Sequence, residues 1–220
     1  MTQKRLFSIL ILALSLGSGF AQAQAPAAQN PDIKLLPPQT DGGRPLMQCL
    51  RERQSLREFS AEKLPPQTLS NLLWAACGIN RPDSGKRTAP TARNWQNIDV
   101  YAAMADGLFL YNVQDHSLTR ILAEDIRAAT GTQPFVKDAP LNLVYVADLS
   151  KIPAGTVEDK RFNSAAHTGF ISQNVYLYCA SEKLATVVRG LVDREALAKT
   201  MKLRPDQHII LAQTVGFPKK

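Results

Sequence analysis

Cysteine and histidine are scarce in this chain, with three of each among 220 residues. The cysteines lack the C-x-x-C spacing of zinc sites, and the histidines lie far apart in the sequence. We therefore expect His116, His167 and His208 to be surface or packing residues, and not metal ligands or catalytic bases. Cys49 and Cys77 could pair in an oxidising compartment, but both lie in apolar helical patterns, which favours free thiols.

The motifs of the common hydrolases and nucleotide enzymes are also missing. The sequence contains no G-x-S-x-G, no H-E-x-x-H, no Walker loop and no G-x-G-x-x-G, which argues against those enzyme classes. The net charge is +7, but the basic residues are scattered and form no long run. Nucleic acid is therefore not an expected partner, and a basic protein that binds some small anion is only a weak alternative.

The start of the chain has the pattern of an export signal. Lys4 and Arg5 precede an apolar run at 6–16, and residues 21–23, Ala-Gln-Ala, have the small-x-small pattern of a cleavage site. The run is short for a membrane anchor, so we predict a signal peptide at 1–23 and a periplasmic or secreted protein with no membrane span after cleavage. The segment QKRLF is one residue away from a twin-arginine motif, although the general route for unfolded chains is favoured.

The mature chain is predicted to be one domain. Residues 24–43 are rich in Pro, Ala, Gln and Gly and indicate a flexible arm, followed by a domain at 44–220. Periodicity predicts helices at 45–53, 66–77 and 193–201, strands at 98–104, 108–113, 141–147 and 208–215, a loop at 81–95, and a helix or strand–helix junction at 118–129. This order favours an α+β fold with a mainly antiparallel central sheet flanked by helices.

Residues 165–190 are the centre of this arrangement. Their apolar side chains spread around a helical wheel, which predicts a central helix buried in a core or at a subunit interface. The helix is expected to give way to a short extended run at 186–188 that ends at Gly190.

Three polar side chains alternate just after the first helix. Arg53, Ser55 and Arg57 would point to one side of an extended segment, where two guanidinium groups and a hydroxyl suit a phosphate. The alternative is a solvated face paired with Glu52 and Glu58, and spacing alone favours that alternative.

Five short segments, in the same order, resemble the FMN-dependent nitroreductase family. RQSLREF at 53–59 is similar to the family's R-x-S-x-R-x-F, and PTARNWQ at 90–96 to its P-S-x-x-N-x-Q. GFISQN at 169–174 resembles G-x-x-x-Q-N, LATVVRG at 184–190 resembles L-G-T-x-x-x-G, and GFP at 216–218 matches the closing G-x-P. The stretch DGLFLYN is most similar to the branch that contains the peptide azoline oxidases.

The resemblance implies an interlocked homodimer that binds FMN at the subunit interface and transfers two electrons to a small organic acceptor such as a nitroaromatic or a quinone. The flavin would perform the redox chemistry, so no catalytic side chain is expected. The implied cofactor-binding residues are Arg53, Gln54, Ser55 and Arg57 for the ribityl phosphate and ring edge, Asn94 from the same chain or the partner, the backbone of Arg189 and Gly190, and Lys219 and Lys220 for the phosphate.

Several positions depart from the family pattern. Thr91 and Ala92 replace a small hydroxyl pair, Ala185 replaces a glycine, and Arg189 stands where an apolar residue is common. Arg189 could stabilise an anionic reduced flavin or obstruct the site. These departures leave open a flavin-less periplasmic binding or structural protein, and the export signal leaves open whether NAD(P)H or a periplasmic reductant is the electron donor.

Overall fold

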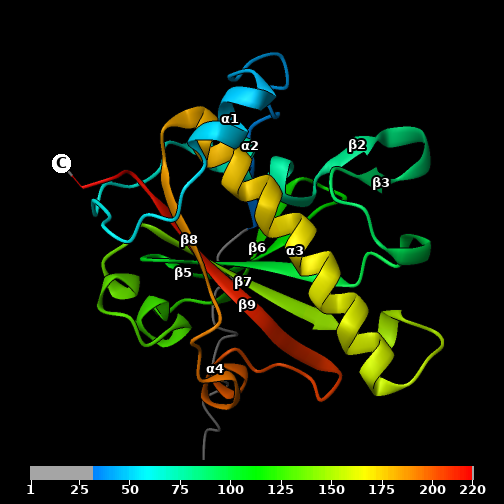
Figure 1. Ribbon diagram of the computed structural model, residues 1–220. Helices are drawn as coiled ribbons and strands as arrows, with labels where there is room; N and C mark the ends of the chain where they lie inside the picture. Colours follow the sequence, from blue (N-terminus) through cyan, green and yellow to red (C-terminus); the bar gives the residue numbers. More distant parts are fainter. Residues whose placement is uncertain (1–31, 220) are drawn as a thin grey trace, which may run out of the picture.

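A seven-stranded antiparallel sheet forms the centre of the computed structural model, which describes residues 32–219 (Figure 1). The signal peptide predicted at 1–23 lies outside the described residues. Every neighbouring pair of strands is antiparallel, as the α+β prediction requires. In spatial order the strands are β1 (Ile33–Lys34), β6 (Ser117–Leu122), β5 (Gly107–Asn112), β4 (Ile98–Met104), β7 (Leu141–Asp148), β9 (Gln207–Gly216) and β8 (Ala185–Arg189).

Both faces of the sheet are covered. Along β7, Leu143 and Tyr145 pack toward the α2 and α3 side, whereas Val144 and Val146 pack toward α4, as the two-residue period of a strand dictates. One face carries α1 (Leu46–Glu52), α2 (Pro66–Cys77) and α3 (Val157–Glu182), and the other carries α4 (Arg194–Thr200) with the 3₁₀ turns η3 (Arg127–Thr130) and η4 (Pro134–Lys137).

Helix α3 crosses the sheet and is longer than the sequence pattern predicts. Its 26 residues span about 39 Å at 1.5 Å per residue. A capping box starts it: the Thr156 hydroxyl accepts the N–H of Asp159, and the Asp159 carboxylate accepts the N–H of Thr156. Residues 157–164 are mostly polar, so the apolar pattern revealed only the later part of the helix. Lys183, in the left-handed conformation with φ 58°, ends it.

Residues 32–36 are fixed to the sheet, although a flexible arm was predicted at 24–43, of which 24–31 lie outside the described residues. Strand β1 pairs with β6, and the Leu36 carbonyl accepts a hydrogen bond from Ser70 Oγ at 2.5 Å. His116 Nε2 lies 3.1 Å from the same carbonyl. Composition did not reveal this, because the anchoring partners are distant in sequence.

Other elements follow the predictions with local differences. The predicted loop at 81–95 contains a hairpin of β2 (Ile79–Arg81) and β3 (Lys86–Arg87) with the turns η1 (Pro82–Ser84) and η2 (Ala92–Asn94). The 118–129 segment is a strand that leads into the η3 turn, so the junction alternative is confirmed. Short turn η5 (Leu149–Lys151) follows β7.

The cysteines are reduced in the structure, as the apolar patterns around them indicate. Cys49, Cys77 and Cys179 are buried free thiols, so the favoured alternative to a disulfide is the one observed. Among residues 32–219, no helix is both long enough and apolar enough to cross a bilayer.

Candidate functional site

Tyr176, on α3, connects three segments that are distant in sequence. Its Oη lies 2.7 Å from Ser55 Oγ and accepts the N–H of Val188 at 2.9 Å. The guanidinium of Arg53 lies over the same ring, 5.3 Å from the centroid. Arg53 and Ser55 therefore do share one side, as their alternation predicts. Tyr176 itself was missed, and its only signal in the sequence is a hydroxyl within the apolar stretch VYLYC.

The segment that carries Arg53 and Ser55 runs along the outer edge of β8. The Leu56 N–H donates to the Thr186 carbonyl at 3.0 Å, and Phe59 forms an isolated bridge with Pro218. These contacts hold the segment extended after α1 ends at Glu52. Arg57 lies in the same extended segment and is exposed.

The ion pairs around α1 bear on the solvated-face alternative. Glu52 pairs with Arg44 and with Arg51, and no ion pair in the described part of the chain includes Arg53 or Arg57. A hydrogen bond from Gln48, with the charges of Arg44 and Arg51, holds the pKa of Glu52 below its usual range. The two arginines of the motif are thus left without a carboxylate partner, which suits an anionic ligand better than a paired surface.

A cavity of about 490 Å³ opens beside Tyr176. Its charged lining is four cations against one carboxylate, because Arg44, Arg51, Arg53 and Lys183 face it together with Glu52. The remaining lining comes from the 53–59 segment, the last turns of α3 and the start of β8: Gln54, Leu56, Tyr176, Cys179, Ala180, Leu184 and Thr186. Such an excess of guanidinium and ammonium groups favours a phosphate-bearing ligand. The contributions of Arg44, Arg51 and Lys183 depend on tertiary packing, and no motif indicated them.

The C-terminal tail returns to the same segment. Ser60 N–H donates to the Phe217 carbonyl at 2.9 Å, and Lys219 N–H donates to the Glu58 carbonyl at 3.2 Å. The structure therefore brings the backbone of Lys219 next to the arginine-bearing segment, although Lys219 is not among the residues that line the cavity. Lys220 lies outside the described residues.

Arg189 does not direct its side chain toward Tyr176. Val187, two residues earlier on the same strand face, packs against Phe59 on the far side of β8 from Thr186, which lines the cavity. The buried guanidinium of Arg189 donates to Thr214 Oγ1 at 3.0 Å and to the Thr130 carbonyl at 2.7 Å. It also donates to Asn142 Oδ1 at 3.1 Å, and burial lowers its pKa to about 10.

The two side-chain roles considered for Arg189, stabilising a reduced flavin or obstructing its site, therefore do not fit its position in this structure. Only its backbone, with that of the exposed Gly190, remains a candidate for cofactor contact. Ala185 is buried in the same small cluster as Val187, which explains why a side chain is accommodated where the family often has glycine.

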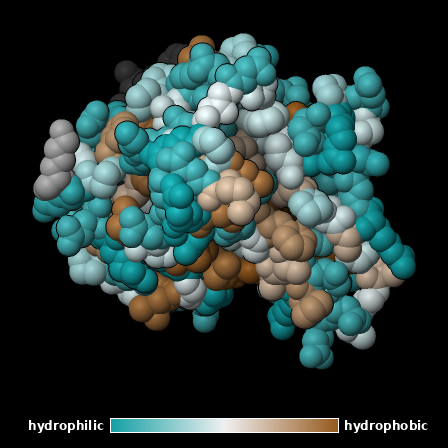
Figure 2. Space-filling model, turned by 45° about the horizontal axis from the view of Figure 1, so that its top comes forward, coloured by the Kyte–Doolittle hydropathy of each residue, from teal (hydrophilic) through white to brown (hydrophobic). Residues whose placement is uncertain are grey.

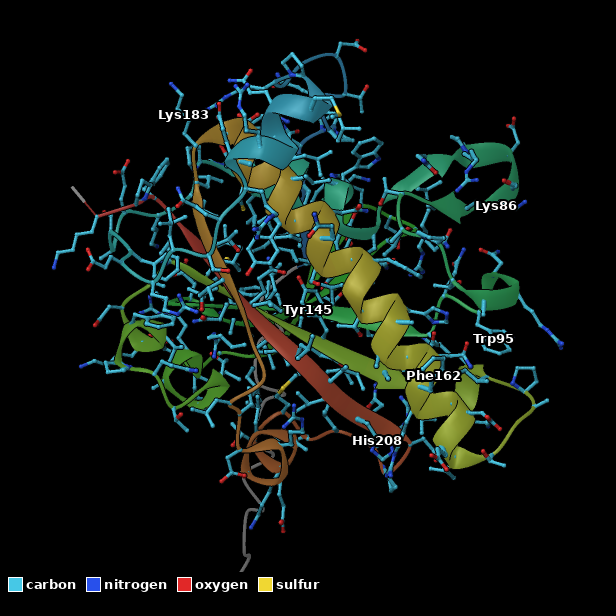
Figure 3. The ribbon with its side chains drawn as sticks, viewed as in Figure 1. Lys86, Trp95, Tyr145, Phe162, Lys183 and His208 are labelled. Carbon is cyan, nitrogen blue, oxygen red and sulfur yellow. The ribbon has the colours of Figure 1, made fainter. Side chains whose placement is uncertain are left out.

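The loop at 90–96 lies apart from the cavity. Figure 3 places Trp95 beside the N-terminal half of α3 and Lys183 at its C-terminal end, and Asn94 is not among the residues that line the cavity. Asn94 has a left-handed φ of 56° and accepts a hydrogen bond from Gln96 Nε2 at 3.0 Å. The structure of one chain therefore does not bring Asn94 together with Arg53.

His167 fixes this loop from α3. Its Nε2 accepts the N–H of Ala92 at 2.8 Å, and Nδ1 lies 2.7 Å from Asn97 Oδ1. An accepting Nε2 requires the neutral tautomer with the proton on Nδ1, and burial lowers the pKa of His167. The prediction of a packing histidine is confirmed, and its partners are the backbone of the loop and a buried amide. Thr91, the other departure in this motif, accepts the N–H of Gln96 at 3.1 Å.

Among residues 32–219, no cluster of three or more His, Cys, Asp or Glu side chains is placed so that it could hold a metal ion. The chemistry that the site can offer is the binding of an anionic ligand along an extended basic segment. This agrees with the absence of a catalytic dyad or triad in the sequence.

Comparison with known proteins places this geometry in a family. The model of the nitroreductase family matches residues 50–217. A protein from Methanocaldococcus jannaschii that is named as a nitroreductase is 28% identical over 182 residues, which cover 78% of this chain and 90% of the relative.

Solved structures of the same fold agree with the family match. A protein from Ralstonia eutropha, described as a nitroreductase, has a TM-score of 0.83 with 42% identity and covers 89% of this chain and 93% of its own. A Desulfovibrio desulfuricans protein solved in complex with FMN has a TM-score of 0.59 with 20% identity, covering 81% of this chain and 89% of its own. The Escherichia coli microcin synthetase complex, at a TM-score of 0.66 and 17% identity over 96% of this chain and 85% of the matched one, shares the fold. The chain thus has an oxidoreductase fold, and it belongs to the nitroreductase family.

Proposed function

We propose that this protein is an FMN-dependent oxidoreductase that transfers two electrons to a small organic acceptor such as a nitroaromatic or a quinone. The observation that supports it best is the grouping of Arg53 and Ser55 at Tyr176, beside a cavity with an excess of cations. A phosphate at the end of a flavin is an anionic group of the kind that this arrangement suits.

Two of the implied residues, Arg53 and Gln54, line the cavity, and Ser55 contacts Tyr176 beside it, which supports FMN as the ligand. Arg53, Ser55 and Arg57 would hold the phosphate together with Lys219, and Gln54 would contact the ring edge. Hydrogen bonds to charged groups contribute about 1.5–3 kcal/mol each, so several would retain FMN without a covalent link. When bound, FMN supplies the electron-accepting and electron-donating group, and the protein positions it.

The backbone of β8 would orient the ring. Tyr176 holds the Val188 N–H, one residue before Arg189 and two before Gly190, so the last part of β8 is fixed on its cavity side. The Arg189 guanidinium is bound on the opposite face, and it would leave the cavity side open. The next residue whose N–H points to this edge after Val188 is the exposed Gly190, so the fixed strand end would present the Gly190 N–H to a planar ligand.

A homodimer is part of the proposal because the site is incomplete in one chain. Asn94 lies away from the cavity, and an equivalent residue of a partner chain would complete it. Two aromatic side chains of α3 are available to such an interface, since Phe162 is 75% exposed and Phe170 is 46% exposed. Apolar surface is visible among the polar side chains in Figure 2, and burying it would favour association.

The proposed location is the periplasm, on the basis of the predicted signal peptide at 1–23. NAD(P)H is scarce outside the cytoplasm, so we propose that the physiological electron donor is a different reductant. Robust oxidation of NADH or NADPH by the purified protein would contradict this part of the proposal.

The decisive experiment is the absorption spectrum of the protein purified from the periplasm, before and after heat release of any bound flavin. We expect a yellow protein that releases about one FMN per chain. Its intact mass should be that of a chain that starts at Gln24. Arg53→Ala should weaken FMN binding, whereas Lys199→Ala, which removes an exposed cation from α4 on the other face of the sheet, should not. A colourless protein that FMN cannot reconstitute would overturn the enzyme proposal in favour of the flavin-less binding protein.

A further inference from the structure

A second cavity, of about 670 Å³, lies between β1, the start of α2 and the turn that joins β4 to β5. We propose that it binds a small amphipathic anion, with an aliphatic body in the cavity and a carboxylate at its rim. This cavity shares no lining residue with the one beside Tyr176, so the proposal does not depend on flavin binding. Its volume lies within the range of roughly 300–1,000 Å³ that is usual for small-molecule sites.

The walls of the cavity are apolar and come from several parts of the chain. The apolar lining includes Ile33, Leu36, Ala61, Leu69, Met104 and Leu141. Of these, Ile33 is 40% exposed and Leu36 is 47% exposed, so apolar surface at this cavity faces water. An aliphatic body would remove this surface from water, which favours binding.

One wall is held in place by a partly buried hydrogen-bond network. The Leu36 carbonyl accepts from Ser70 Oγ, and His116 Nε2 contacts both groups, at 3.1 Å and 2.8 Å. His116 Nδ1 lies 2.8 Å from the Tyr111 hydroxyl. The segment that closes the cavity is therefore tied to α2 and to the sheet, so the cavity exists before a ligand arrives.

The rim is charged, and part of that charge is already neutralised. Lys63 pairs with Asp106 at 3.1 Å. Arg127 pairs with Asp125 at 2.7 Å and donates to the Ala139 carbonyl at 2.9 Å. These two cations are committed to partners within the chain.

Two further lysines on the rim have no such partner. Lys34 and Lys137 line the cavity, and within the described part of the chain neither forms an ion pair. The one other carboxylate on the rim is Asp138, so a positive excess remains. An apolar hollow with an ammonium excess at its mouth is complementary to a fatty-acid-like carboxylate and disfavours a cationic or neutral ligand of the same shape.

The test is calorimetric titration of the full-length protein with decanoate, with decan-1-ol as the uncharged analogue. We expect saturable binding of decanoate at one site per chain and weaker binding of decan-1-ol. Ala61→Trp should abolish binding, because Ala61 is exposed at the cavity and a large side chain there fills the hollow without removing a packed residue.

A pair of charge reversals isolates the role of the rim. Lys137→Glu should weaken decanoate binding by roughly threefold or more, as expected for the loss of an exposed charge interaction, and should leave decan-1-ol unchanged. Lys86→Glu makes the same change on the distant β2–β3 hairpin, which Figure 3 shows away from the sheet, and should have no effect.

Three results would overturn the proposal. They are the absence of decanoate binding, equal affinity for decanoate and decan-1-ol, and an equal effect of the two charge reversals. The flavin content measured on the same samples reports separately on the proposed cofactor site.

Discussion

Replacing Tyr176 with phenylalanine tests whether one hydroxyl holds the candidate site together. Tyr176→Phe keeps the ring under Arg53 but removes the acceptor of the Val188 N–H and the partner of Ser55 Oγ. Each hydrogen bond contributes about 1 kcal/mol net. Because Val188 is half-buried, water replaces its partner only in part. We expect a loss of about 2 kcal/mol in the free energy of unfolding, or roughly 4–8 °C in Tm for a chain of this size.

Tyr178→Phe is the matched control. Tyr178 lies two residues later on α3, and its hydroxyl makes one long hydrogen bond, 3.3 Å to the Thr68 carbonyl. Its loss should cost about 0.5 kcal/mol. Urea unfolding of the two variants, with FMN affinity measured in parallel, tests whether the Tyr176 hydroxyl stabilises the site. Equal destabilisation by the two substitutions would refute the reasoning, as would unchanged stability of Tyr176→Phe.

Two further predictions concern stability. Burial lowers the pKa of both His116 and His167, so the unfolded chain takes up these protons at a higher pH than the folded chain. The free energy of unfolding should therefore be at its maximum above about pH 6.5 and should fall as the pH drops below that value. A urea-unfolding midpoint that does not change between pH 7.5 and 5.5 would contradict this. Gly78→Ala should destabilise by about 1–3 kcal/mol, because a Cβ there would lie 2.4 Å from Trp74 Cδ1. Gly42→Ala, where nothing lies within 4 Å of the added atom, should leave the thermal midpoint unchanged.

The strands and the shorter helices could be predicted because their signals are local. Alternation and the Asp106-Gly107 turn placed β4 and β5, and Asp193 is the N-cap of α4 as predicted, accepting the Ala196 N–H at 3.0 Å. Gly78 follows α2 as expected, but with φ −66°. The reason for this glycine is the closeness of the Trp74 side chain and not a left-handed cap.

The candidate site could be predicted only in part, because only some of its signals are local in the sequence. The alternation of Arg53 and Ser55 is local and was correct, whereas the cations that complete the cavity come from the chain before α1 (Arg44), from α1 itself (Arg51) and from the end of α3 (Lys183). The direction of the Arg189 side chain depends on which face of β8 an odd-numbered residue occupies. That face is set by the pairing of β8 with β9, which no single segment reveals.

The segment 53–59 also covers the β8 edge of the sheet, which protects the protein from strand-to-strand aggregation. Strand β8 is the last in the sheet, and such an edge offers unpaired backbone groups to any other exposed strand. Here the Leu56 N–H and the Tyr176 hydroxyl occupy two of those groups, while the opposite edge, β1, is only two residues long. Substitutions that loosen this segment should therefore promote aggregation as well as impair ligand binding, so solubility must be measured before a loss of activity is assigned to the site.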